Sequence, residues 1–250
     1  MTSLDNKVIL VTGASSGLGR ATALMCATRG AKVFGVGRDE NALQALTNNK
    51  SFPAGTIKTG VYDLSTAHAC KSAVADCLTA FGSLDVLINV AGKHHFRSLE
   101  NITEEDWQED IAINLSAPFF LSQAAMPELL KNKGNIINVA SIAGLQGQAY
   151  STGYCAAKHG IIGLTRALAM EYTKAELRVN AICPGGMDTP QVQNMAIPEN
   201  VDFDLLMRSA APRGMMNADE VAAFICFIAS DEASAIHGAV YPIDRGKTVG

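Results

Sequence analysis

The feature that most constrains this chain is the regular alternation of short apolar runs with longer helical segments. The runs at 8–11, 86–88 and 136–139 are almost wholly apolar, which is typical of strands buried on both faces of a sheet. Such strands alternating with helices predict an α/β fold with a doubly wound parallel sheet. We expect seven strands, at 7–12, 31–36, 56–62, 84–89, 135–140, 178–183 and 239–243. We expect helices at 17–29, 40–47, 66–81, 104–131, 151–172 and 219–230.

These elements account for nearly all of the chain, so we interpret residues 1–250 as a single domain. The one long irregular stretch, 184–213, predicts a substrate lid over about 187–213. With 48% hydrophobic and 18% charged residues, the chain does not have the composition of a disordered protein. A net charge of −4 carries no electrostatic footprint for nucleic acid or for an anionic membrane surface.

The same sequence indicates a cytoplasmic protein. No apolar run reaches the roughly 18 residues of a membrane span, and the first residues lack the pattern of a signal peptide. The six cysteines contain no C-x-x-C pair, which favours reduced thiols. The five histidines show no metal-ligand spacing, so we expect no metal site.

A glycine-rich loop follows the first predicted strand and precedes the first helix. It reads T-G-A-S-S-G-L-G over residues 12–19 and places glycine at Gly13, Gly17 and Gly19. Glycine permits a tight turn, close approach of backbone N–H groups to phosphate oxygens and close packing of the helix on the sheet. Because a helix N-terminus favours an anion, the loop predicts a dinucleotide-binding site.

The end of the second strand bears on which dinucleotide binds. Gly37 stands where an acid would bind the ribose hydroxyls of NAD, and Arg38 follows it. An arginine suits a 2′-phosphate, so we favour NADP(H) over NAD(H). The alternative is that Asp39 or Glu40 turns toward the ribose, which would favour NAD(H).

Four residues suggest the chemistry. Tyr154 and Lys158 lie four positions apart, which puts them on one face of the predicted helix. An ammonium beside a phenol favours the phenolate, so we expect Lys158 to lower the pKa of Tyr154 and make it a general acid or base. Ser141 ends the fifth strand, where doubly wound sheets bind ligands. Asn114, a polar residue in an apolar helical stretch, either anchors a bend or holds a proton-relaying water.

Together these motifs resemble the short-chain dehydrogenase/reductase (SDR) family. They occur in the family's order: the glycine loop, N-V-A-G at 89–92, Asn114, Ser141, Tyr154 with Lys158, and P-G-G-M-D-T at 184–189. The resemblance implies a Rossmann sheet of order 3-2-1-4-5-6-7 and an NAD(P)-dependent enzyme acting on CH–OH groups. It also implies a catalytic tetrad, in which Tyr154 is the acid/base, Ser141 orients the substrate oxygen, Lys158 tunes Tyr154 and Asn114 holds the water relay.

The resemblance further implies the cofactor-binding residues. They are Gly13, Ser15, Ser16, Gly17, Leu18, Gly19, Arg38, Asp63, Leu64, Asn89, Ala91, Gly92, Tyr154, Lys158, Pro184, Gly185, Met187 and Thr189. Two positions depart from the family pattern: Val90 replaces the second Asn of N-N-A-G, and Arg245 replaces a glycine of D-G-G. We expect Arg245 to alter the backbone near a subunit contact.

The substrate side is suggested by a lid rich in methionine, which makes adaptable apolar surface. We expect an NADP(H)-dependent oxidoreductase interconverting a largely apolar secondary alcohol and a ketone, with Ser141, His94 and Tyr150 as candidate substrate residues. The alternatives are a 3-oxoacyl-[acyl-carrier-protein] reductase and a non-catalytic NADP-sensing protein. Apolar residues on several faces of the long helices, with the resemblance, imply a homotetramer or dimer.

Overall fold

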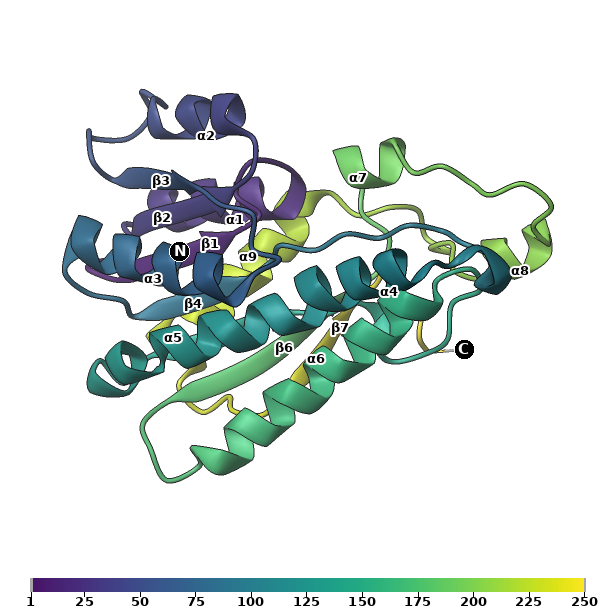
Figure 1. Ribbon diagram of the computed structural model, residues 1–250. Coiled ribbons are helices and arrows are strands. Elements are labelled where there is room, and N and C mark those ends of the chain that lie inside the picture. Colours follow the sequence, from purple (N-terminus) through teal and green to yellow (C-terminus); the bar gives the residue numbers. More distant parts are fainter. Residues whose placement is uncertain (1, 250) are drawn as a thin grey trace.

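The computed structural model describes residues 2–249 and contains one seven-stranded parallel sheet of order β3-β2-β1-β4-β5-β6-β7 (Figure 1). The strands are β1 Val8–Thr12, β2 Lys32–Gly37, β3 Ile57–Val61, β4 Val86–Asn89, β5 Asn135–Val139, β6 Arg178–Pro184 and β7 Val240–Ile243. The predicted fold class and strand order are therefore confirmed, and each predicted strand lies within one or two residues of its observed bounds.

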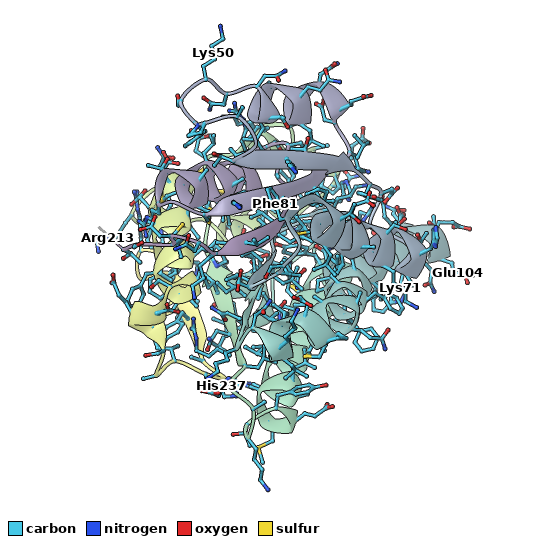
Figure 2. All side chains as sticks on the ribbon, turned by 90° about the vertical axis from the view of Figure 1, so that its left-hand side faces the viewer. Lys50, Lys71, Phe81, Glu104, Arg213 and His237 are labelled. Carbon is cyan, nitrogen blue, oxygen red and sulfur yellow. The ribbon has the colours of Figure 1, made fainter. Side chains whose placement is uncertain are left out.

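Helices cover both faces of the sheet, as strands that are apolar on both sides require. On one face lie α1 (Gly17–Thr28), α2 (Glu40–Thr47) and α9 (Ala218–Ala229), packed on residues such as Ile9 and Ile137. On the other lie α3 (Ala67–Phe81), α5 (Ala117–Lys131) and α6 (Thr152–Glu171). Figure 2 shows the two layers, with Lys71 of α3 on one side of the sheet and the yellow α9 on the other. Among residues 2–249, no helix has the length and hydropathy that crossing a membrane requires.

The helix predicted over 104–131 is interrupted. It consists of α4 (Glu104–Ile111), a π-helical turn at Ala112–Ser116 and α5. The side-chain amide of Asn114 donates to the carbonyl of Asp110, four residues earlier, at 3.0 Å. In an α-helix that carbonyl accepts from the backbone N–H of residue 114, so the side chain competes with the backbone and the turn widens.

The stretch predicted to be irregular contains two short helices, α7 (Pro190–Gln193) and α8 (Phe203–Met207). Figure 1 shows both standing away from the sheet, beyond the carboxyl ends of the strands. The segment is tied at its base, where Met187 pairs with Met216 as an isolated parallel bridge. The chain between these two residues therefore forms a flap whose two ends meet.

Candidate active site

A cavity of about 1200 Å³ lies at the carboxyl ends of the strands. Its wall includes the glycine loop, the ends of β2 and β3, the segment after β4, Ser141 after β5, Tyr154 and Lys158 of α6, and the flap. The carboxyl edge of a doubly wound sheet is where such folds bind ligands. Elements far apart in sequence therefore line one site.

The glycine loop forms the floor of one end of this cavity. Gly13 and Gly17 have φ of +71° and +50°, a region that side chains disfavour. A Cβ at Gly19 would lie 2.1 Å from the carbonyl oxygen of Gly13, so only glycine lets the loop fold back on α1. Ser16, the N-cap of α1, makes no side-chain cap, which leaves the first backbone N–H groups of α1 free for an anion.

The end of β2 lies beside this loop. A Cβ at Gly37 would lie 2.9 Å from the Ser15 hydroxyl oxygen, so the loop leaves no room there for an acidic side chain. Arg38 lines the cavity. The carboxylate of the next residue, Asp39, accepts from the N–H of Ala42 at 3.0 Å and caps α2. Within residues 2–249, the Arg38 side chain makes no hydrogen bond or ion pair, whereas Asp39 is engaged in the helix cap.

Thr12, at the end of β1, holds the segment after β4 against the glycine loop. Its hydroxyl oxygen accepts from the N–H groups of Val90 and Ala91, both at 2.9 Å. Asn89 turns away from the cavity and donates to Asn138 at 2.9 Å. Sequence reasoning missed Thr12, although its position directly before Gly13 was a signal that could have identified it.

Asn114 is 1% exposed and holds the same segment from the other side. It donates to the carbonyls of Lys93 and Asp110, both at 3.0 Å, and its Oδ1 accepts from the N–H of Lys93 at 3.1 Å. A Cβ at Gly92 would lie 2.7 Å from Asn114 Oδ1 and 3.3 Å from Lys158 Nζ. The sequence left two roles open for Asn114, anchoring a bend or holding a proton-relaying water. The structure shows the first, as the π-helical turn, and places the amide near Lys158.

Tyr154 and Lys158 share one face of α6, as their spacing predicts. The Lys158 ammonium lies 5.5 Å from the centroid of the Tyr154 ring and donates to the carbonyl of Val139 at 3.0 Å. Ser141 is a hydrogen-bond partner of the phenol, and its hydroxyl oxygen also accepts from the N–H of Ala143 at 3.1 Å. The three side chains face one end of the cavity.

The electrostatics of this group correct one expectation. Burial raises the pKa of Tyr154 to about 12, and only the hydrogen bond with Ser141 lowers it. Burial also lowers the pKa of Lys158 to about 8. The protein alone therefore does not acidify the phenol, because taking both groups out of water outweighs the attraction between an ammonium and a phenolate.

His94 packs directly on Tyr154. The two rings are stacked, with centroids 4.1 Å apart and planes inclined by 19°. Phe96 meets the imidazole edge-on, with ring centroids 4.8 Å apart. His94 Nε2 lies 2.8 Å from the hydroxyl oxygen of Ser151, the residue before α6. The predicted position of His94 in the wall of the pocket is thus observed.

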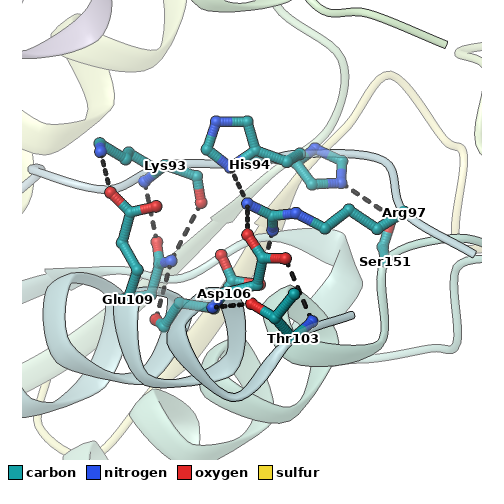
Figure 3. Close-up of polar contacts among 10 residues, drawn as sticks. Lys93, His94, Arg97, Thr103, Asp106, Glu109 and Ser151 are labelled. Carbon is teal, nitrogen blue, oxygen red and sulfur yellow. Dashed lines mark hydrogen bonds and ion pairs between the residues drawn. The ribbon is translucent and has the colours of Figure 1, made fainter. Parts of the chain in front are cut away.

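An ion-pair network supports this wall (Figure 3). Arg97 contacts Asp106 at 2.8 Å and Asp110 at 3.4 Å, and Lys93 pairs with Glu109. Asp110 is 3% exposed, and a Cβ at Gly153 would lie 2.5 Å from its carboxylate. Burial raises the pKa of Asp110, and Arg97 opposes that shift. The network therefore joins the segment after β4 to α4, and Asp110 of α4 packs against Gly153 of α6, one residue before Tyr154.

Tyr150 does not line the cavity, which corrects its predicted place in the pocket wall. Its φ is +61°, and its hydroxyl oxygen accepts from the N–H of Asp202 at 2.6 Å. Its backbone carbonyl accepts from the backbone N–H of Arg97 at 2.8 Å. Tyr150 therefore ties the flap to the segment after β4.

Arg245 anchors the other end of the flap. Its guanidinium donates to the carbonyls of Arg213 and Met215 at 3.2 and 2.9 Å and pairs with Glu220 at 2.8 Å. Its φ of +52° shows why glycine also suits this position. Sequence reasoning expected altered backbone here and missed the clamp, since its partners lie 25 to 32 residues away in the sequence.

Most residues predicted for catalysis, cofactor binding or substrate binding line this cavity. The exceptions are Asn89, Asn114 and Tyr150, which lie behind its wall. The residues that do line it are Gly13, Ser15, Ser16, Gly17, Leu18, Gly19, Arg38, Asp63, Leu64, Ala91, Gly92, His94, Ser141, Tyr154, Lys158, Pro184, Gly185, Met187 and Thr189.

Comparisons with known proteins agree with this arrangement. The family model "short chain dehydrogenase" matches residues 7–200. The chain is 39% identical to the short-chain dehydrogenase/reductase olcF of Penicillium canescens, with 96% of each chain covered. It is 36% identical to the 3-oxoacyl-[acyl-carrier-protein] reductase FabG of Thermotoga maritima, with 98% of this chain and 99% of that protein covered.

A solved structure shows the same fold. The 3-ketoacyl-(acyl-carrier-protein) reductase of Brucella melitensis, complexed with NADH, is similar with a TM-score of 0.88 at 27% identity. The match covers 98% of this chain and 100% of that chain. The protein is therefore an oxidoreductase that belongs to the short chain dehydrogenase family, as its motifs predicted.

Proposed function

We propose that this protein is an NADP(H)-dependent enzyme that interconverts a secondary alcohol and a ketone. The observation that carries the proposal is the cavity itself. The glycine loop and the side chains of Ser141, Tyr154 and Lys158 line one continuous space. A dinucleotide-binding loop and a phenol that can exchange a proton are therefore open to the same ligand volume.

The residues present fit a nicotinamide dinucleotide. The uncapped N-terminus of α1 offers free N–H groups for the pyrophosphate, and the glycines at 13, 17 and 19 leave room for its approach. Asp63 and Leu64 line the cavity toward β3, and Met187 and Thr189 line it at the flap. When bound, the nicotinamide supplies or takes the hydride, and its oxidised ring adds a positive charge.

Tyr154 moves the proton at the substrate oxygen. Its hydroxyl gives the proton when a ketone is reduced, and its phenolate takes one when an alcohol is oxidised. Ser141 holds the same oxygen by a hydrogen bond, and the Lys158 ammonium favours the phenolate form. With a pKa of about 12 in the protein alone, Tyr154 is protonated at neutral pH, the state that reduction requires.

Preference for NADP(H) rests on Arg38. Asp39 is engaged as the cap of α2, and Glu40 accepts from Gln44 at 3.3 Å, so both carboxylates have partners within the helix. Gly37 leaves no acid at the strand end. We expect NADPH to bind more tightly than NADH, and Arg38→Ala to remove most of that difference in a fluorescence titration. Equal affinity for both cofactors in the wild type would contradict this assignment.

An apolar substrate is favoured by the flap. Its side chains that line the cavity include Met187, Val192, Met195, Ile197, Leu206, Met207 and Met215. Similarity to FabG keeps acyl-carrier-protein substrates as an alternative, which would need a basic docking patch at the mouth. The cavity wall formed by α4 instead carries Glu105, Asp106 and Glu109, and the nearby cations Arg97 and Lys93 are already paired with Asp106 and Glu109. We therefore favour a free carbonyl compound over a carrier-bound one.

A panel of ketones and alcohols, followed at the absorbance of the reduced nicotinamide, tests the reaction. We expect turnover of alicyclic or aromatic carbonyl compounds and none of small polar sugars. Tyr154→Phe should abolish turnover and retain cofactor binding. Two results together would instead fit the NADP-sensing alternative. The protein would turn over no compound in either direction, and Tyr154→Phe would leave its binding to a regulated partner protein unchanged.

We also propose that the enzyme is a homo-oligomer and acts in the cytoplasm. Apolar side chains on the outer faces of α4, α5 and α6, including Trp107, Phe119 and Met170, are 39%, 42% and 75% exposed. Burying such surface against a second copy is favourable. All six cysteines are free thiols, as a reducing compartment favours. Light scattering of the purified protein and imaging of a tagged chain test these two points.

A further inference from the structure

His94 offers more than an aromatic surface to the site. It lines the cavity while its ring stacks on the phenol that exchanges the proton. A substrate whose oxygen lies at Tyr154 therefore places its neighbouring atoms near the imidazole. The remaining question is which hydrogen-bonding group the imidazole presents to them.

We assign the tautomer of His94 from the hydrogen bonds around Ser151. The Ser151 hydroxyl donates to the carbonyl of Ala149 at 3.3 Å, so its oxygen is left to accept. His94 Nε2 lies 2.8 Å from that oxygen, and in this assignment it carries the proton and donates it to Ser151. In a neutral ring Nδ1 is then a bare acceptor. Figure 3 shows the side chains of His94 and Ser151 in this region.

The surroundings keep the ring neutral. Burial is the main cause that lowers the pKa of His94 to about 4, and the neighbouring His95 and Lys158 act in the same direction. Tyr154 stacks on the ring, Phe96 meets it edge-on, and Ser151 from the start of α6 contributes no charge. At neutral pH the imidazole therefore accepts at Nδ1 and does not act as a cation.

Nδ1 makes no hydrogen bond to any side chain or backbone group within residues 2–249. An acceptor without a partner in a largely apolar pocket loses free energy unless a ligand or water donates to it. We propose that His94 Nδ1 accepts a hydrogen bond from a hydroxyl or amide N–H that the substrate carries one or two carbons from the reacting carbon. This inference rests on the proposed function, and it restricts the substrate class to alcohols and ketones with a neighbouring donor.

Three related compounds test the proposal with the wild-type enzyme. They are trans-1,2-cyclohexanediol, trans-2-methoxycyclohexanol and cyclohexanol, each oxidised with NADP⁺. The methyl ether keeps the second oxygen and lacks the donor, and cyclohexanol controls for size. We expect kcat/KM for the diol to exceed that of the other two by about tenfold, which corresponds to about 1.4 kcal/mol.

Two neighbouring histidines give a matched pair of variants. His94→Phe keeps an aromatic ring against Tyr154 and removes the acceptor, so the ratio of diol to methyl ether should fall to about one, whatever the change in absolute rate. His95→Phe, at an exposed position beside it, should retain the wild-type ratio.

The possible results separate the inference from the function on which it rests. Equal kcat/KM for the three compounds in the wild type, or a preference that survives in His94→Phe, would overturn the role of Nδ1 and leave the alcohol oxidation intact. No turnover of any of the three would instead count against the proposed function and remove the inference with it. The wild-type comparison stands even if His94→Phe does not fold.

Discussion

Among the residues of the ion-pair network beside the cavity, Arg97 is the one whose removal we expect to destabilise the protein most strongly. Its side chain is 18% exposed, and it is the cation beside the Asp110 carboxylate, whose side chain is 5% exposed. Arg97→Met keeps the aliphatic stem and removes the charge. Asp110 is then left buried without a cation, and one of its oxygens, Oδ1, already lacks a hydrogen-bond partner.

The size of the effect follows from this burial. Removing one partner of a buried ion pair costs about 3 to 5 kcal/mol, because the remaining charge stays out of water. The 3.4 Å separation and the second partner, Asp106, place Arg97→Met near the lower end, at about 3 kcal/mol. For a chain of this length that loss lowers the melting temperature by roughly 6 to 12 °C.

The loss should depend on pH in one direction. Burial already raises the pKa of Asp110, and Arg97 is the largest of the influences that lower it. Without Arg97 the folded-state pKa rises further above the value of the unfolded chain. The destabilisation is therefore complete above that folded pKa and shrinks as the pH falls through it, since the folded protein then binds the extra proton.

Urea denaturation followed by circular dichroism at pH 8 and pH 5 measures both effects. Lys133→Met is the control, because Lys133 and Glu176 form a pair that is 66% and 71% exposed and should contribute less than about 1 kcal/mol. Adding Asp110→Asn to Arg97→Met should recover most of the loss. A deficit below about 1 kcal/mol, or one that is equal at both pH values, would refute the argument from burial.

Three further predictions concern α6 and its neighbour. Gly153→Ala should destabilise by about 1 to 3 kcal/mol because its Cβ would meet Asp110 at 2.5 Å, whereas Gly163→Ala, with nothing within 4 Å, should stabilise by about 0.5 to 1 kcal/mol; thermal melts compare them. Lys158→Met should abolish turnover yet raise stability by about 1 to 2 kcal/mol at pH 7, because burial lowers the lysine pKa to about 8; unchanged or lower stability would contradict this. With a folded pKa of about 4, His94 should cost the wild type up to about 3 kcal/mol of stability between pH 6.5 and pH 4, a decline that His94→Phe should lack in urea titrations.

Much of the fold follows from short-range pattern. A strand that is apolar on both faces, such as β1, needs cover on both sides, and this requirement alone leads to a layered sheet. The glycine loop and the pair of Tyr154 and Lys158 are equally local, because a turn and a helical spacing of four residues are properties of the backbone. These elements were predicted close to their observed positions.

The errors arose where side chains compete with the backbone or reach across the fold. The helical periodicity of 104–131 continues through Asn114, yet the Asn114 amide takes the Asp110 carbonyl and opens a π turn. Tyr150 has the sequence spacing of a pocket residue, but its backbone has a positive φ and its hydroxyl binds the N–H of Asp202 in the flap. Neither of these two side-chain contacts changes the hydrophobic pattern of the sequence, so neither could be predicted from it.

The acidity of the phenol was decided by burial. Helical spacing puts an amine near Tyr154, but only the packed structure removes both groups from water, and desolvation then raises the pKa of the phenol and lowers that of the amine. Ser151 and His94 meet across 57 residues of chain, and Arg245 reaches the flap across 30 or more. Periodicity and spacing describe neighbours along the chain, whereas solvent exclusion and contacts between distant segments exist only once the sheet and its helices have packed.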